Sequence, residues 1–137
     1  MQHKGYRKLF HCVYQLQYHL VIVTKYRNRC LTKEMLAQLR TICEEQLARK
    51  EGALLEFNGE ADHLHLLIEL PPKASVSSVV NSLKTVTARL LRRDFGAHLR
   101  RYYWKPILWS RSYFVASCGG APLSVIRQYI QQQEAPH

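Results

Sequence analysis

The sequence predicts an α+β fold of the ferredoxin-like (split βαβ) type, with an antiparallel sheet, helices on one face and an open second face. Two observations predict it. The chain reads as strand, helix, strand, strand, helix, strand, helix, and the first six elements have the split βαβ order. In residues 62–70, two histidines alternate onto one strand face and four aliphatic residues onto the other. We expect the aliphatic face to meet the helices.

Length and composition indicate one domain with a polyanionic partner. The chain has 137 residues, 47% of them hydrophobic, so we expect a single domain over residues 1–137. Lys and Arg total 20 against 10 Asp and Glu, a formal net charge of +10 that suits a nucleic acid. Aromatic residues are interleaved with basic ones in the C-terminal third, where base stacking and phosphate pairing can act together.

The cysteines and the N-terminus indicate a soluble protein of a reducing, cytoplasmic compartment. The four cysteines show no C-x-x-C spacing, so neither a zinc knuckle nor a disulfide framework is predicted. The basic start of the chain has no hydrophobic signal region, and no run of about 20 apolar residues predicts a membrane span. We therefore expect no membrane partner.

The first half of the chain predicts a long strand, a helix and a hairpin. Residues 1–9 read as a loose basic arm, and residues 10–26, rich in Val, Ile, Tyr and Phe, as one long strand. A helix then begins after Thr32, a good N-cap, and stops at Gly52. Residues 53–58 form the next expected strand, which turns back directly into the histidine strand.

The second half predicts two further helices and one more strand. A helix is expected over residues 75–95, with its apolar side toward the sheet. Residues 97–112 mix aromatic and basic residues without a helical or strand period and read as an irregular functional loop. The last strand is expected over residues 113–118, followed by a flexible joint at Gly119-Gly120 and a final helix over residues 122–134.

The histidine strand is a candidate metal site. His63 and His65 stand side by side on the open face, and imidazole is the commonest side-chain metal ligand. The His-x-His pattern alone also fits two histidines that are only hydrogen-bonded, because short motifs match by chance.

The final helix carries a second candidate pair. Tyr129 and Gln133 are four residues apart, so they lie one above the other on a single helical face. If this helix crosses the open sheet face, it brings a phenol and an amide oxygen toward the histidines. The alternative is an amphipathic end helix with a half-buried tyrosine.

Basic and aromatic side chains in four segments are candidate nucleic-acid contacts. They follow the first strand, line the polar side of the second helix, and fill the aromatic loop. The candidates are Lys25, Arg27, Lys84, Arg89, Arg92, Arg100, Arg101, Trp104, Lys105, Trp109 and Arg111.

Four groups of residues, taken together and in order, resemble the TnpA-like single-tyrosine HUH transposases of small bacterial and archaeal insertion sequences. The resemblance covers nearly the whole chain. Its motifs are Tyr18-His19-Leu20-Val21 with Thr24-Lys25-Tyr26-Arg27, Asp62-His63-Leu64-His65-Leu66-Leu67, Leu108-Trp109-Ser110 with Ser112-Tyr113-Phe114, and Gln128-Tyr129-Ile130 with Gln133.

The resemblance implies a transposase that cuts and rejoins single-stranded DNA at hairpin element ends, through a 5′-phosphotyrosine intermediate. It implies Tyr129 as the nucleophile and His63, His65 and Gln133 as metal ligands. Two imidazoles and one amide leave positions for phosphate and water, as Mg²⁺ or Mn²⁺ requires. It further implies a homodimer in which the histidines of one chain act with the tyrosine of the other.

Two other readings of the sequence remain open. Ferredoxin-like sheets also serve as non-catalytic nucleic-acid-binding modules, although the RNP1 pattern of such a module is missing here. A domesticated HUH endonuclease, which nicks repeated hairpins of its host without moving an element, would have the same site residues.

Overall fold

Four strands form the central sheet of the computed structural model, which describes residues 7–9, 12–118 and 123–133. The strands are β3 (Gln17–Thr24), β4 (Ala53–Gly59), β5 (His63–Glu69) and β6 (Trp109–Ser117). Their order is β4-β5-β3-β6, and every neighbouring pair is antiparallel. The first and third of these strands in sequence are the central pair, which confirms the ferredoxin-like prediction.

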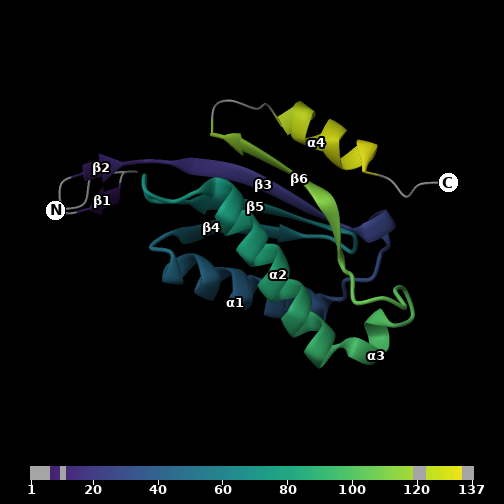
Figure 1. Ribbon diagram of the computed structural model, residues 1–137. Helices are drawn as coiled ribbons and strands as arrows, with labels where there is room; N and C mark the ends of the chain where they lie inside the picture. The colour runs from purple at the N-terminus through teal and green to yellow at the C-terminus, as the bar shows by residue number, and fades with distance from the viewer. Residues whose placement is uncertain (1–6, 10–11, 119–122, 134–137) are drawn as a thin grey trace.

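Helices cover the two faces of this sheet unequally (Figure 1). The long helices α1 (Lys33–Arg49) and α2 (Val76–Asp94) lie together on one face, and α4 (Leu123–Gln132) lies over the other. The main hydrophobic core fills the layer between the sheet and the two long helices. It includes Leu20, Ile22, Leu39, Leu47, Leu64, Leu66, Ile68, Leu83 and Leu91. The aliphatic face of β5 therefore meets the helices, as its alternation predicts.

Local signals set where the long helices begin and end. The Thr32 side chain accepts a hydrogen bond from the Met35 backbone N–H at 3.2 Å, which caps α1 as predicted. Ser75 caps α2 in the same way. At Gly52, where α1 turns into β4, a Cβ atom would lie 2.6 Å from the Glu69 carbonyl oxygen. Only glycine allows the chain to pass so close to β5.

The predicted long strand over residues 10–26 is divided in the structure. β1 (Arg7–Leu9) and β2 (Cys12–Tyr14) form a small antiparallel sheet of their own, whereas β3 pairs with β5 and β6. The strand signal is continuous, but its pairing partner changes near residue 15. β3 then ends in the short 3₁₀ helix η1 (Lys25–Arg27). Most of the expected N-terminal arm lies outside the described residues.

The predicted irregular loop over residues 97–112 is partly regular. Its start forms the short helix α3 (Gly96–Leu99), and β6 begins at Trp109, earlier than predicted. The dense mixture of aromatic and basic residues hides the strand alternation there. The Gly119-Gly120 joint lies outside the described residues, and α4 ends at Gln132. No helix in the described ranges is long and apolar enough to cross a membrane.

Candidate active site on the open face of the sheet

The strand register places both histidines on the open face. His63 lies opposite Val23, His65 lies opposite Val21, and Val21 lies opposite Phe114 of β6. Directly opposed residues of antiparallel strands point to the same side of a sheet. Both imidazoles therefore stand with a small apolar patch on the side away from α1 and α2.

Helix α4 packs on this same face. Tyr129 and Ile130 pack against buried Val21 and Val23, and the Tyr129 ring lies 5.3 Å from the Phe114 ring, centroid to centroid. This contact explains why the final helix is amphipathic, because its apolar side covers β3 and β6. The tyrosine is thus on the face predicted for it, half-buried.

Tyr129 and Gln133 meet at Ser112, which belongs to one of the family motifs but was not among the predicted site residues. The Tyr129 hydroxyl donates to Ser112 Oγ at 3.4 Å, and Ser112 donates to Gln133 Oε1 at 3.0 Å. The helical alignment of the two side chains is therefore as predicted. Across the described segments, neither of them hydrogen-bonds to His63 or His65. Ser112 lies on β6, and its contacts with the two side chains depend on the packing of α4 over that strand.

Asp62 fixes the His63 ring. Its Oδ1 accepts a hydrogen bond from His63 Nδ1 at 2.8 Å, and its Oδ2 lies 2.7 Å from Arg27 Nε. Burial alone would raise the pKa of Asp62, but the hydrogen bonds and charges of His63 and Arg27 lower it below its usual value. The carboxylate therefore holds the proton of His63 on Nδ1 and leaves Nε2 outside this network.

His65 is paired with a third histidine of the open face. His19 of β3 places its Nδ1 3.1 Å from His65 Nε2. Burial lowers the pKa of His65, and the nearby His19 and His63 lower it further. A neutral imidazole is the form that binds metals. The strand alternation of residues 17–23 put His19 on a polar face, but its nearness to His65 required the pairing of β3 with β5.

The donor set of this face suits a divalent cation. His63 and His65 are on one rigid strand, and each ring keeps a nitrogen outside the hydrogen bonds just described. In the described part of the chain, no three His, Cys, Asp or Glu side chains are grouped to hold a metal ion. The predicted third ligand, Gln133, is an amide and so falls outside those four residue types. Its side-chain oxygen accepts a hydrogen bond from Ser112.

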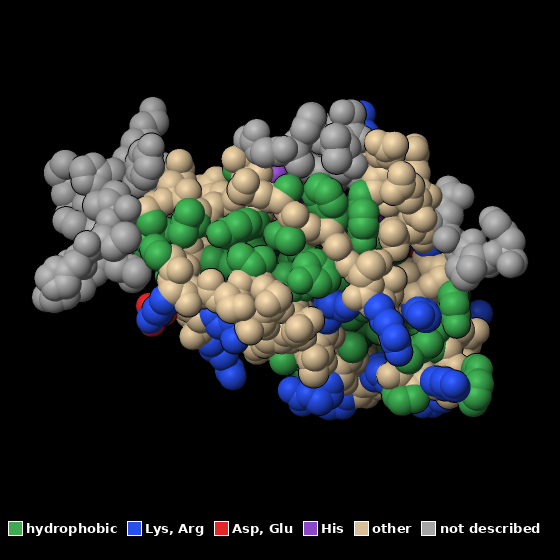
Figure 2. Space-filling model, turned by 45° about the horizontal axis from the view of Figure 1, so that its top comes forward, with side chains coloured by type: hydrophobic (Ala, Val, Ile, Leu, Met, Phe, Trp, Pro, Cys, Tyr) green, Lys and Arg blue, Asp and Glu red, His purple; other side chains and the backbone are tan. Residues whose placement is uncertain are grey.

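The predicted DNA contacts differ in exposure. Arg89, Arg100, Arg101, Trp104, Lys105 and Arg111 are exposed, whereas Lys25, Arg27, Lys84 and Arg92 are half-buried. Figure 2 shows Lys and Arg side chains gathered at the end of the molecule where α2 ends and α3 lies. Trp109 differs from the prediction that it is exposed to contact DNA. It is 8% exposed, lies in the core, and donates its indole N–H to Thr87 Oγ1 at 2.9 Å, which argues against DNA contact.

Comparison with known proteins identifies the family. The family model described as "Transposase IS200 like" matches residues 12–133. The chain belongs to this family. It is 33% identical over 127 residues to the transposase for insertion sequence element IS200 of Salmonella typhimurium, covering 93% of this chain and 82% of the relative. It is 32% identical to the ISDra2 transposase TnpA of Deinococcus radiodurans, covering 88% and 86%.

Solved structures agree with this membership. The IS200-like chain superposes with a TM-score of 0.83 on a transposase candidate from Deinococcus radiodurans R1, at 31% identity and over 95% of this chain and 99% of the other. A REP-associated tyrosine transposase bound to a REP hairpin gives a TM-score of 0.57 at 13% identity, over 95% of this chain and 68% of the other. The second likeness shows the fold alone. Membership in this family implies an enzyme of DNA transposition that cleaves and joins DNA.

Proposed function

We propose that this IS200-like transposase cuts and rejoins single-stranded DNA at hairpin element ends, through a covalent 5′-phosphotyrosine at Tyr129. The observation that carries the proposal is the open face, which holds His63, His65 and the Tyr129-bearing helix α4 together. The chemistry requires these three groups on one surface, because the phosphate must be held and attacked at the same place.

Tyr129 supplies the nucleophile. A phenol has a pKa of about 10 in water and is a weak nucleophile at neutral pH. The Tyr129 oxygen loses its proton and forms a bond to the scissile phosphorus, while the bond from phosphorus to the 3′ oxygen breaks. The departing 3′ oxygen takes up a proton and leaves as a 3′-hydroxyl. The phosphate ester is kept, so a second 3′-hydroxyl can reverse the step and join a new strand without ATP.

His63, His65 and Gln133 would hold the cation. Asp62 keeps the His63 proton on Nδ1, and the lowered pKa of His65 favours the neutral form that binds metals, so the two rings would suit an Mg²⁺ or Mn²⁺ ion. A bound divalent ion supplies Lewis-acid polarisation of the scissile phosphate. Ser112 hydrogen-bonds to both Tyr129 and Gln133 and thereby keeps the two side chains together on α4.

The basic end of the molecule would bind the DNA backbone. Exposed Arg89, Arg100, Arg101, Lys105 and Arg111 supply charge for phosphates, and such contacts give most of the affinity for nucleic acid. Binding should therefore weaken steeply as salt rises. A folded hairpin offers both a duplex backbone and unpaired bases beside it, which suits the combination of arginines and exposed aromatic rings.

The transposase would act as a homodimer with shared sites, the histidines of one chain acting with Tyr129 and Gln133 of the other. In this structure α4 packs on the open face of its own chain, and the exchange would seat the same helix on the same face of the partner. The hydrogen bonds of Tyr129 and Gln133 go to Ser112 and to neither histidine of their own chain, which is compatible with such an exchange. A two-fold dimer would repeat the same exchange on both sides.

The covalent intermediate tests the proposed function. The native protein is incubated with hairpin-bearing single-stranded DNA and Mg²⁺, and a denaturing gel is read for a protein–DNA adduct. Tyr129→Phe should bind the DNA and give no adduct, because the attacking oxygen is gone. The matched control Tyr113→Phe, on β6, should react like the native protein. An undiminished adduct in Tyr129→Phe, or in native protein treated with EDTA, contradicts the proposal.

Mixing two inactive variants tests the shared sites. Tyr129→Phe and His65→Ala should each be inactive alone, whereas a mixed dimer has one site with both intact parts. Cleavage should therefore return when the two are mixed, once mass measurement shows that subunits exchange. Exchange without recovered cleavage means that each site is built within one chain.

A further inference from the structure

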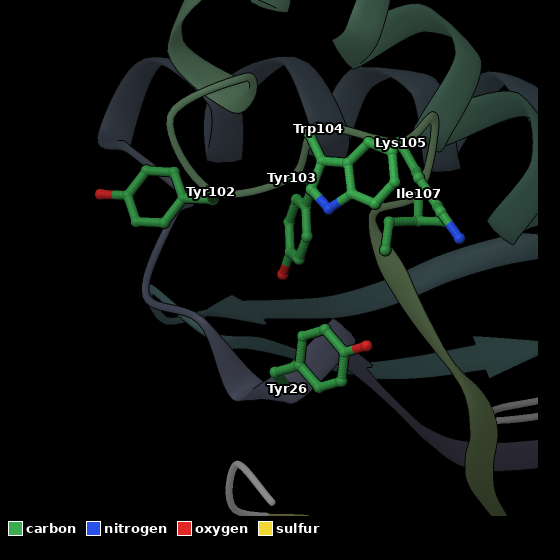
Figure 3. Close-up of a pocket in the computed structure, with 6 residues that line it drawn as sticks. All are labelled: Tyr26, Tyr102, Tyr103, Trp104, Lys105 and Ile107. Carbon is green, nitrogen blue, oxygen red and sulfur yellow. The ribbon is translucent and has the colours of Figure 1, made fainter.

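A hollow lies where β3 runs into η1, and its lining shares no residue with the open-face site. It has a volume of about 220 Å³. Figure 3 shows the Tyr26 ring from the η1 turn facing the side chains of the loop that precedes β6. The lining residues are Tyr26, Tyr102, Tyr103, Trp104, Lys105 and Ile107.

We propose that this hollow, the aromatic pocket, holds one unpaired base of the DNA strand. The inference rests on the proposed function, which makes single-stranded DNA the substrate. The pocket is smaller than the roughly 300–1,000 Å³ of sites for drug-sized molecules, so it suits a group the size of one planar ring system. It would place a nucleotide of the strand without itself taking part in the chemistry.

The chemistry of the lining favours a base attached to a phosphate. Trp104 is 87% exposed and Tyr26 is 48% exposed, so both rings offer a bare face for stacking. Each ring has a lysine beside it. Lys105 Nζ lies 5.0 Å from the Trp104 ring centroid, and Lys25 Nζ lies 5.3 Å from that of Tyr26. No acidic side chain is among the lining residues, so the pocket pairs aromatic faces with positive charge.

The pocket is held in place by buried contacts and carries backbone strain. The hydroxyl of buried Tyr103 donates to the Lys25 carbonyl oxygen at 2.6 Å, which ties the loop to the η1 turn. The backbone φ angles of Tyr26 and Arg27 are 60° and 54°, values that residues other than glycine seldom adopt. Such strain persists where the surrounding structure fixes it, and it is common at binding sites. The backbone that carries Tyr26 is therefore held in place at the edge of the pocket.

The η1 turn that carries Tyr26 is also connected to the candidate active site by hydrogen bonds. Arg27, next to Tyr26, binds Asp62, and Asp62 binds His63. The aromatic pocket and His63 thus lie at the same end of the sheet, connected through two short contacts. A base held in the pocket would belong to the stretch of strand that flanks the cut phosphate. Because every base has a stacking face, the pocket would tolerate different bases.

Fluorescence of Trp104 tests this pocket directly, since the other tryptophan, Trp109, is shielded in the core. The native protein is titrated in EDTA with dT8 and with an abasic deoxyribose-phosphate octamer of the same length. Quenching by dT8 and not by the abasic octamer is the expected result, because both carry the phosphates but only dT8 carries bases. In Trp104→Phe, the emission that remains should be unaffected by dT8.

Affinities of three variants complete the test. Trp104→Ala should bind dT8 roughly 5- to 150-fold more weakly, the range expected for one lost stacking contact. Tyr26→Gly, which keeps the positive φ and removes the ring, should lose affinity similarly. The matched control Leu55→Ala, at an exposed position 40% accessible on β4, should bind like the native protein.

The outcomes separate this proposal from the proposed function. Equal quenching by the abasic octamer, or native affinity for dT8 in both Trp104→Ala and Tyr26→Gly, overturns the pocket even if the Tyr129 adduct forms. Base-dependent quenching with weakened variants supports the pocket even if no adduct forms, in which case the proposed function alone fails.

Discussion

Single hydrogen bonds decide which nitrogen atoms the open-face histidines can offer. Asp62 accepts from His63 Nδ1 and is itself held by Arg27, whereas His65 faces His19 through Nε2. A carboxylate behind a histidine fixes its tautomer and orientation, which makes the ring a better ligand. The two histidines of β5 are therefore unequal, and His63 is the better oriented of the two.

Removing the Asp62 carboxylate should weaken metal binding. In Asp62→Asn the amide no longer enforces the Nδ1 proton, so we expect roughly 10- to 100-fold weaker Mn²⁺ binding, the usual effect of such a partner. Electron paramagnetic resonance of free Mn²⁺ during a titration measures it. Asp94→Asn, which changes an exposed carboxylate paired with Arg93, is the matched control. Equal Mn²⁺ affinity in Asp62→Asn would show that this carboxylate does not orient a ligand.

The elements of the fold were predicted from local patterns, and the errors arise where pairing partners matter. Alternation predicted β5 and its two faces, and capping predicted the start of α1. The division of residues 10–26 was missed because the strand signal does not show which strand each part pairs with. His19 and Ser112 were missed as site residues for the same reason. Their contacts with His65 and Gln133 span 46 and 21 residues of sequence.

Two threonines in α1 test the capping. Thr32→Ala removes the side chain that caps the helix, so the free energy of unfolding should fall by about 1 kcal/mol. Thr41→Ala makes the same change at an exposed mid-helix position, where alanine has the higher helix propensity, so stability should stay equal or rise. Urea unfolding measures both. Equal effects of the two substitutions would mean that Thr32 does not cap α1.

The two faces of the central sheet differ in how they are packed. The face toward α1 and α2 carries the continuous core, and the face toward α4 carries the histidines, Tyr129 and only a small apolar cluster. The IS200-like relatives share this scaffold over most of their length. Under the proposed function, the open face would bind DNA and metal without disturbing the packing that holds the chain folded.

Thiol reactivity tests this division. Cys30 and Cys43 are buried, which raises the pKa of Cys30 to about 11 and that of Cys43 to about 12. The pKa of Cys118 is also raised, but this thiol is exposed and therefore accessible. Iodoacetamide should therefore alkylate Cys118 in the native protein and reach Cys30 and Cys43 only after unfolding. Peptide mass spectrometry gives the extent of each reaction. Alkylation of Cys43 as fast as that of Cys118 in native protein would contradict the packing of α1 on the sheet.

The central claim is that Tyr129 forms the bond to DNA, and mapping the adduct tests it most directly. The protein–DNA adduct is trimmed with nuclease, digested with trypsin and analysed by mass spectrometry. The peptide that begins at Gln128 contains Tyr129 as its one tyrosine, so nucleotide mass on that peptide is the predicted result. Nucleotide mass on a peptide carrying Tyr102, Tyr103 or Tyr113, with none on the Tyr129 peptide, would contradict it.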